Sequence, residues 1–251
     1  MFAPMRPSPI IPNCMGQGCH AADPFRTGPR SVPRVTDRTT DIRRVHDAHA
    51  VLLAHLDAMT GTDAADPSAP SLLPGWTRGH VLTHIAGNAR SFIRQLEGAE
   101  SGVPAERYPG GDAFRDDEIA QGAGRTWDEL VADVRTSAEE LDAALDRNLR
   151  WDVPGINTDG SELPTHDVPF RRVRETVVHH ADLGDPGYTG EQWPAEYVRE
   201  ELRRQEMIWN ARRPMGATGL PEAALKAPPV LRLQWLLGRA EIDGLDPAGV
   251  F

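Results

Sequence analysis

Cysteine is scarce in this sequence: its 251 residues contain only Cys14 and Cys19, both near the N-terminus. A disulfide framework is therefore excluded, and residues 20–251 offer no thiol nucleophile. Lysine is scarcer still, because Lys226 is the only one. It lies in no G-x-x-x-x-G-K-[ST] motif, which excludes a P-loop. Its setting, Leu225-Lys-Ala-Pro-Pro229, predicts a loop and argues against a Schiff-base enzyme.

Positive charge and long apolar runs are also lacking. Twenty-seven Lys and Arg residues against 37 Asp and Glu residues give a net charge of −10. Such a chain repels nucleic-acid phosphates and anionic membrane surfaces. No stretch approaches the ~18 apolar residues of a membrane span, and the first thirty residues hold no apolar segment of a secretory signal. We therefore predict a cytoplasmic protein without nucleic-acid or membrane partners.

The first 34 residues differ in composition from the rest of the chain. They contain seven prolines and little apolar periodicity, which predicts a disordered N-terminal extension. Cys14, Cys19 and His20 lie in this segment and could supply metal ligands, but a flexible tail is the preferred interpretation.

Four amphipathic helices of similar length are predicted in the middle of the chain, over 36–59, 77–98, 126–149 and 165–183. Thr77 is a good N-cap for the second helix, and the capping box Thr126-Trp-Asp-Glu129 opens the third. The fold class is therefore mainly α, with a four-helix bundle. The connections 61–76 and 98–125 are long enough to carry function, and the second holds a short helical piece around 114–120.

A small C-terminal part follows the bundle. The pattern predicts helices over Pro194–Arg213 and Val230–Glu241, and no β-sheet is predicted anywhere. The resulting domain boundaries are 1–34 for the extension, 35–186 for the helical bundle and 187–251 for a reduced C-terminal domain.

Histidine and glutamate residues on the second and fourth predicted helices point to a metal. Glu175 and His179 are four residues apart, so they share one helix face and can reach one ion. A histidine from the second helix, His80 or His84, would complete a His₂Glu set, which with an open fourth position is typical of catalytic zinc.

Periodicity alone leaves a simpler interpretation open. Glu175 and His179 lie opposite the apolar stripe of their helix, together with Arg172 and Asp182, so the pattern equally fits a solvated polar face. On the second helix, His84 flanks the apolar stripe, whereas His80 is predicted to point toward solvent.

Two motifs resemble those of the mycothiol-dependent maleylpyruvate isomerase family, a branch of the DinB-like metal-binding bundles. They are Leu73-Pro-Gly-Trp-Thr-Arg-Gly-His-Val-Leu-Thr-His84-Ile-Ala-Gly-Asn88-Ala and Arg174-Glu175-Thr-Val-Val-His179-His-Ala-Asp182-Leu-Gly184. The resemblance covers about 36–185. It implies a zinc or another divalent metal on His84, Glu175 and His179, and a pocket lined by this polar face. Asp182 is then expected to accept the second ring N–H of a metal-bound histidine, while His80 and His180 are assigned to the surface or to loop packing.

Two arginines extend the resemblance. Phe114-Arg115-Asp-Asp-Glu-Ile119 is similar to an arginine-containing segment of the family, and Trp235-Leu-Leu-Gly238-Arg239 is similar to its C-terminal Gly-Arg motif. Arg115 and Arg239 are therefore candidate catalytic residues that bind carboxylates, with surface solvation as the alternative for each. The chain departs from the family between Arg213 and Val230, where it is shorter.

The resemblance implies a zinc- and mycothiol-dependent cis–trans isomerase. Because the predicted bundle contains no cysteine, the thiol would come from mycothiol as a cosubstrate, and it would add reversibly to maleylpyruvate or a similar unsaturated keto acid to yield the trans isomer. A mycothiol S-transferase acting on another electrophile is the first alternative. A non-catalytic metal-binding bundle is the second, in which His49 or His80 would have to complete the coordination sphere.

Overall fold

The computed structural model describes residues 38–212 and 219–248, which form two compact units. One unit contains residues 38–193, and the other contains the described residues from 194 onward. The predicted N-terminal extension 1–34, with Cys14, Cys19 and His20, lies outside the described residues.

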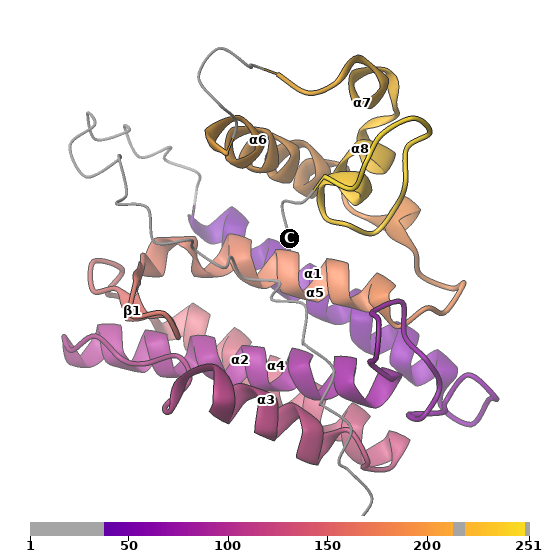
Figure 1. Cartoon of the computed structure of the whole chain (residues 1–251). Helices are drawn as coiled ribbons and strands as arrows, with labels where there is room; N and C mark the ends of the chain where they lie inside the picture. Colours follow the sequence, from indigo (N-terminus) through magenta and orange to yellow (C-terminus); the bar gives the residue numbers. More distant parts are fainter. Residues whose placement is uncertain (1–37, 213–218, 249–251) are drawn as a thin grey trace, which may run out of the picture. The chain divides into compact units, whose positions relative to one another are not determined.

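The larger unit is a bundle of four long helices (Figure 1), as the sequence predicts. These are α1 (Arg38–Met59), α2 (Arg78–Ser101), α4 (Trp127–Arg147) and α5 (Val168–Asp182). The helix α2 packs extensively on α4, and α1 packs on α5 and on α4. Leucine, valine and isoleucine side chains from all four helices fill the core, including Leu52, Ile85 and Leu141, which are fully buried. The mainly α fold class is confirmed.

Capping boxes open two of these helices. At the start of α4 the Glu129 carboxylate accepts a hydrogen bond from the Thr126 backbone N–H over 2.9 Å. At the start of α2 a histidine takes the same role, because His80 Nδ1 accepts from the Thr77 backbone N–H over 3.2 Å. His80 is half-buried beside Trp76. The prediction that it points into solvent is therefore wrong, because it caps its own helix.

The connection between α2 and α4 holds α3 (Gly111–Gly122), which extends beyond the predicted 114–120 and packs against α2. Before α5 the chain forms a short antiparallel hairpin of β1 (Gly155–Ile156) and β2 (Glu162–Leu163). The prediction that the chain contains no β-sheet is therefore wrong. Strands of two residues are too short to show an alternating pattern in the sequence. A single-turn helix η1 (Thr165–Asp167) then leads into α5.

The helix α5 is buried on its polar side as well as on its apolar side. Four charged or titratable side chains on that face are at most 3% exposed: Arg172, Glu175, His179 and Asp182. A solvated polar face is therefore the wrong interpretation of this pattern. Periodicity records the polarity of side chains, and these polar groups are buried because groups on neighbouring helices face them.

The smaller unit contains three helices after the single-turn η2 (Gly190–Gln192). They are α6 (Ala195–Ala211), α7 (Glu222–Lys226) and α8 (Pro229–Leu236). Two sequence predictions are corrected here. The helix α8 ends before 241, since Gly238 takes a left-handed conformation with φ of 69°. Lys226 ends a helix instead of lying in a loop, and its ammonium group pairs with Glu222 one turn earlier.

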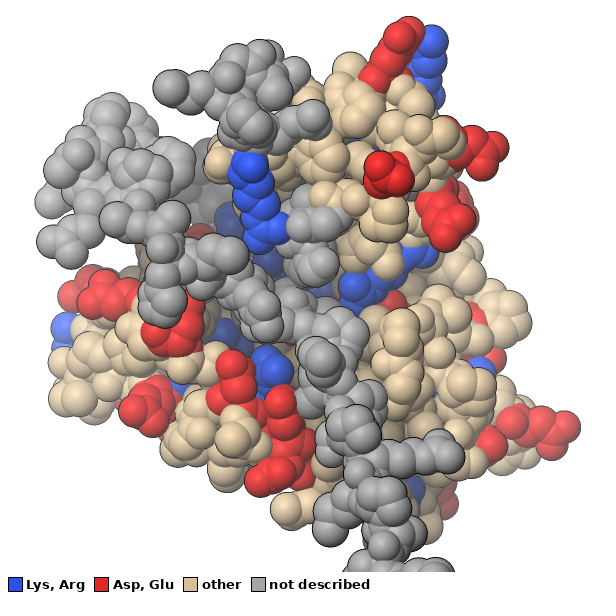
Figure 2. Space-filling view, in the orientation of Figure 1, with Lys and Arg blue, Asp and Glu red and all other residues tan. Residues whose placement is uncertain are grey.

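The described surface carries charges of both signs. On the face drawn in Figure 2, Asp and Glu side chains are interspersed with Lys and Arg among the described residues. No helix within the described ranges combines the length and apolar character that crossing a membrane requires.

Candidate metal centre

Three side chains from α2 and α5 converge inside the bundle. One ligand atom each of His84, Glu175 and His179 lies within 4.8 Å of the other two. His84 Nε2 is 3.1 Å from Glu175 Oε2, and His179 Nε2 is 3.5 Å from the same oxygen. The three side chains that the motifs nominate are thus neighbours in space, although about ninety positions separate His84 from Glu175.

These distances suit a small divalent ion. Tetrahedral coordination with bonds of ~2.0–2.1 Å places ligand atoms roughly 3.3 Å apart, and the separations of 3.1 and 3.5 Å lie on either side of that value. Imidazole and carboxylate together favour zinc and other first-row transition metals. Among the described residues no fourth histidine, cysteine, aspartate or glutamate joins the group. The donor set therefore fits a metal with three protein ligands.

Asp182 holds the ring of His179 in a suitable orientation. Its Oδ2 lies 2.9 Å from His179 Nδ1, and the carboxylate is fully buried. With a metal bound, an N–H at Nδ1 that donates to this carboxylate would leave Nε2, the nitrogen that faces Glu175, free to act as the ligand atom. Asp182 thus lies where it can accept the second ring N–H of His179, the role expected for it from the sequence.

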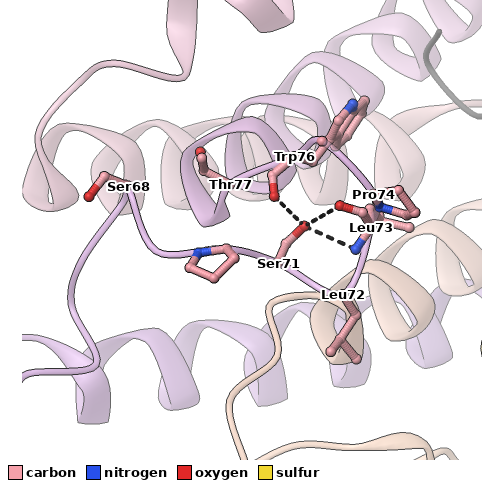
Figure 3. Close-up of a pocket in the computed structure, with 9 residues that line it drawn as sticks. Ser68, Ser71, Leu72, Leu73, Pro74, Trp76 and Thr77 are labelled. Atoms are coloured by element: carbon pink, nitrogen blue, oxygen red, sulfur yellow. Dashed lines mark hydrogen bonds between the residues drawn. The ribbon is translucent and has the colours of Figure 1, made fainter. Parts of the chain in front are cut away.

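The loop before α2 also contacts the end of α5, so it touches both helices that carry the cluster. Its Leu72 backbone N–H donates to the Asp182 carbonyl at the end of α5 over 2.9 Å. Figure 3 shows Ser71 at the centre of this loop, where its hydroxyl donates to the Trp76 carbonyl over 3.0 Å. A pocket of about 390 Å³ lies along residues 68–77. Trp76 belongs to its lining and also places its ring edge-on to His84, with centroids 5.7 Å apart.

Burial sets the charge state of the cluster. It lowers the pKa of His84 to about 4, although the hydrogen bond with Glu175 opposes the shift. Burial by itself would raise the pKa of Glu175, but hydrogen bonds with His179 and His84 outweigh it and hold that pKa well below its ordinary value. At neutral pH the site therefore offers neutral His84 and an ionised carboxylate, which are the forms that bind metal.

Comparison with known proteins decides the family. The family described as "Mycothiol maleylpyruvate isomerase N-terminal domain" matches residues 45–184, which is more than half of the chain. The chain belongs to this family. The matched range contains His84, Glu175 and His179 and leaves out the smaller unit.

Two solved structures agree with the family in fold. One is the crystal structure of the mycothiol-dependent maleylpyruvate isomerase, and the other is that of a mutant of it with one histidine replaced by alanine. Each is 22% identical to this chain, with a TM-score of 0.69, and the match covers 81% of this chain and 90% of the other. Comparison with curated proteins finds no match. The resemblance drawn from the two motifs is confirmed.

The two predicted arginines lie in different units. Arg115, on α3, is half-buried and donates to Asp116 over 3.0 Å. Its positive charge contributes to lowering the pKa of His84, so it lies within electrostatic reach of the cluster. Arg239 follows α8 in the smaller unit, and its Nη1 donates to the Leu237 carbonyl over 2.8 Å. Catalytic roles for both arginines stay predictions.

His180 is not a surface residue. It is 1% exposed, its ring stacks on Tyr188 with centroids 3.6 Å apart, and its Nε2 lies 2.7 Å from His55 Nδ1. The other ring nitrogen of His55, Nε2, lies 2.9 Å from Asp185 Oδ1. His180 therefore packs the end of α5 against α1 and the following loop, and of the two roles expected for it only loop packing agrees with the structure.

A buried polar network beside the cluster was not found by sequence reasoning. Arg172, fully buried on α5, donates to His49 Nε2 over 2.8 Å and to Asn88 Oδ1 over 2.9 Å. Arg107, 2% exposed, donates to the Ser91 hydroxyl over 2.9 Å. Neither arginine lies on an apolar stripe or in a known motif, so no sequence signal distinguishes them from surface arginines.

The position of His49 in this network predicts a loss of stability in acid. Its Nε2 accepts from Arg172 and its Nδ1 lies 2.8 Å from Asp142, so the native ring is neutral. Burial, followed by the charge of Arg172, lowers its pKa from 6.5 to about 4. The unfolded chain therefore binds the extra proton between these two values. Stability due to His49 is complete above pH 6.5 and is lost toward pH 4, by about 1.4 kcal/mol per pH unit.

Urea unfolding of the metal-free protein at pH 7 and pH 5 measures this effect. We expect His49→Gln, which can still accept from Arg172 but does not titrate, to lose less stability between the two pH values than the wild type. Replacement of the exposed His166 by Gln is the control, and it should leave the wild-type pH dependence unchanged. An equal pH dependence in His49→Gln and wild type would contradict the assignment.

Proposed function

We propose that the protein is a metal- and mycothiol-dependent cis–trans isomerase of maleylpyruvate or a closely similar unsaturated keto acid. The observation that carries this proposal is the three-ligand cluster, which no fourth protein ligand completes among the described residues. Such donor sets are characteristic of catalytic metal sites, whereas structural sites have four protein ligands. Membership of the family and the mycothiol dependence named for both solved structures support the choice of thiol.

The protein would hold the metal, preferably zinc, through His84, Glu175 and His179, with Asp182 fixing the ring of His179. When bound, a divalent metal at this site lowers the pKa of a coordinated thiol, so that thiolate is available at neutral pH. An external thiol is proposed because residues 38–193, which form the larger unit, contain no cysteine.

Reversible addition accounts for the change of geometry. The thiolate sulfur forms a bond to one carbon of the cis double bond, and the π electrons move to the conjugated carbonyl oxygen as an enolate. Rotation about the new single bond follows, after which the enolate electrons return and expel the thiolate. Arg115 and Arg239 are proposed to bind the carboxylates and to stabilise the enolate. No thiol is consumed.

Thiol stoichiometry tests the proposal. The protein is purified without chelator, its metal content is measured, and maleylpyruvate is added with and without mycothiol. We expect about one metal per chain and conversion to fumarylpyruvate that needs only trace thiol. Consumption of one thiol per product would instead support the mycothiol S-transferase. Absence of any thiol-dependent reaction of maleylpyruvate in the metal-loaded protein would overturn the isomerase proposal.

A further inference from the structure

The α2–α5 interface is polar beyond the metal cluster. The two helices run antiparallel, so that His84 faces Glu175 and Asn88 faces Arg172, and Gln95 farther along α2 contacts Thr165 of η1, just before α5. Asn88 lies one helical turn after His84, and Arg172 lies three residues before Glu175. At ~1.5 Å of rise per residue, the Asn88–Arg172 pair is roughly 5–6 Å along the interface from the cluster.

We propose that Arg172 and Asn88 form a binding site for a carboxylate group of the electrophile. The inference rests on the proposed function for the reaction that the acid undergoes, and it adds a carboxylate-binding pair in the bundle interior to the two arginines, Arg115 and Arg239, named above. A small unsaturated acid is the expected ligand, with its carboxylate on these two side chains and its double bond next to the metal cluster.

Unused hydrogen-bond donors are the first observation that supports this site. The guanidinium of Arg172 uses Nε and Nη1, the latter toward the carbonyl of Ile85 and the amide oxygen of Asn88. Its Nη2 and the Asn88 Nδ2 have no hydrogen-bond partner within the part of the chain that the structure describes. Both residues are fully buried. Burying a donor without an acceptor is unfavourable, and the oxygens of a carboxylate accept hydrogen bonds from donors of both kinds.

The neutral character of the groups that accept from Arg172 is the second observation. All three groups that accept hydrogen bonds from Arg172 are neutral: the imidazole of His49, a backbone carbonyl and an amide. A second buried guanidinium, Arg107, lies close enough to Glu175 for the two charges to interact. Two buried cations therefore share this interior with Glu175, which the two histidines already engage. Glu175 and Asp142 interact with the Arg172 charge, but no carboxylate among the described residues accepts a hydrogen bond from its guanidinium. A carboxylate ligand would supply such an acceptor.

The orientation of the donors is fixed before a ligand arrives. Asn88 Oδ1 accepts from Arg172 Nη1, which determines which side of the amide carries the N–H groups. The Arg172 side chain is in turn held by His49, and Asp142 contacts the other nitrogen of that ring. A rigid pair of donors recognises a planar carboxylate at a low cost in conformational entropy.

Binding of an anion to the metal-free protein tests the site separately from the reaction. Maleate and its neutral diamide, maleamide, are titrated calorimetrically into chelator-treated protein. The decisive variant is Asn88→Asp, which keeps the oxygen that Arg172 needs but replaces the N–H groups by a negative charge. Asn148→Asp makes the same change at another buried asparagine of the same unit and serves as the control. Unfolding curves confirm that both variants fold.

We expect wild-type protein to bind maleate in preference to maleamide. Asn88→Asp should weaken maleate binding by at least about 10-fold, the value of one charged hydrogen bond, and Asn148→Asp should not. Asn88→Ser, which removes the amide donors without adding a charge, should weaken binding in the same direction and replaces Asn88→Asp if that variant does not fold.

Three results would overturn the site: no maleate binding by the metal-free wild type, equal binding of maleate and maleamide, or unchanged binding in both Asn88 variants. A purely structural role for Arg172 predicts the last of these. Selective maleate binding that is lost in Asn88→Asp, combined with no isomerase or transferase activity, would leave the anion site standing and remove the proposed function.

Discussion

Replacing His84 by alanine is expected to lower the affinity of the protein for Zn²⁺ by more than about 100-fold. Removing groups that merely orient a metal ligand typically costs 10–100-fold in affinity, and His84 is proposed to be a ligand itself. The remaining pair, Glu175 and His179, lies on one helix and spans 3.5 Å between its donor atoms. With His84 absent, α2 contributes no donor to the ion, so the metal loses the contact that joins two helices.

A competition titration with a chromophoric chelator measures this change. The control is His80→Ala, which makes the same substitution one turn earlier on α2, at a residue that caps the helix and is absent from the cluster. We expect His80→Ala to lower stability slightly and to leave the Zn²⁺ affinity within a few-fold of wild type. Retention of metal by His84→Ala at wild-type affinity would remove the proposed site.

The second large effect concerns folding. Arg172→Met should lower the free energy of unfolding by about 3–5 kcal/mol, because three buried acceptors lose their donor and each unsatisfied group costs about 1–3 kcal/mol. The methionine fills a similar volume, yet it leaves His49 Nε2, the Ile85 carbonyl and Asn88 Oδ1 without the donor that now reaches all three. Such a loss is a large part of the 5–15 kcal/mol that stabilises an ordinary domain.

Arg135→Met provides the matched control, since Arg135 forms an exposed ion pair with Asp57 over 2.6 Å. Exposed pairs of this kind contribute at most about 1 kcal/mol. Urea denaturation at pH 7 compares the two variants with wild type. Should Arg172→Met prove no less stable than Arg135→Met, the network would not stabilise the bundle and Arg172 would be free to serve ligand binding alone.

Local signals were strong enough to predict most of the bundle. The capping box at Thr126 and the N-cap at Thr77 begin helices where expected, because a cap depends on a few neighbouring residues. The errors occur where local signals are weak. The hairpin at 155–163 has two residues per strand, and α7 has five residues, so neither contains enough of a repeat to be recognised.

The candidate site was predicted mainly from the motifs shared with the family and less from residue spacing on the helices. Spacing places Glu175 and His179 on one face, but a solvated face explains the same spacing, and only the family resemblance favoured a buried site. The resemblance could not reveal Arg172 or Asn88 as an interacting pair, because it matched residues to the family's known ligands. These two residues lie 84 positions apart in the sequence.

By itself the sequence determined where the four long helices of the bundle form, which family the chain belongs to and which side chains can act as ligands. These depend on local periodicity and on the identity of residues within short motifs. The tertiary structure decided which polar residues are buried together: His84 against Glu175, and Arg172 against Asn88 and His49. The physical reason is that the cost of burying a charge depends on what faces it across the helix interface, and that partner comes from a distant part of the chain.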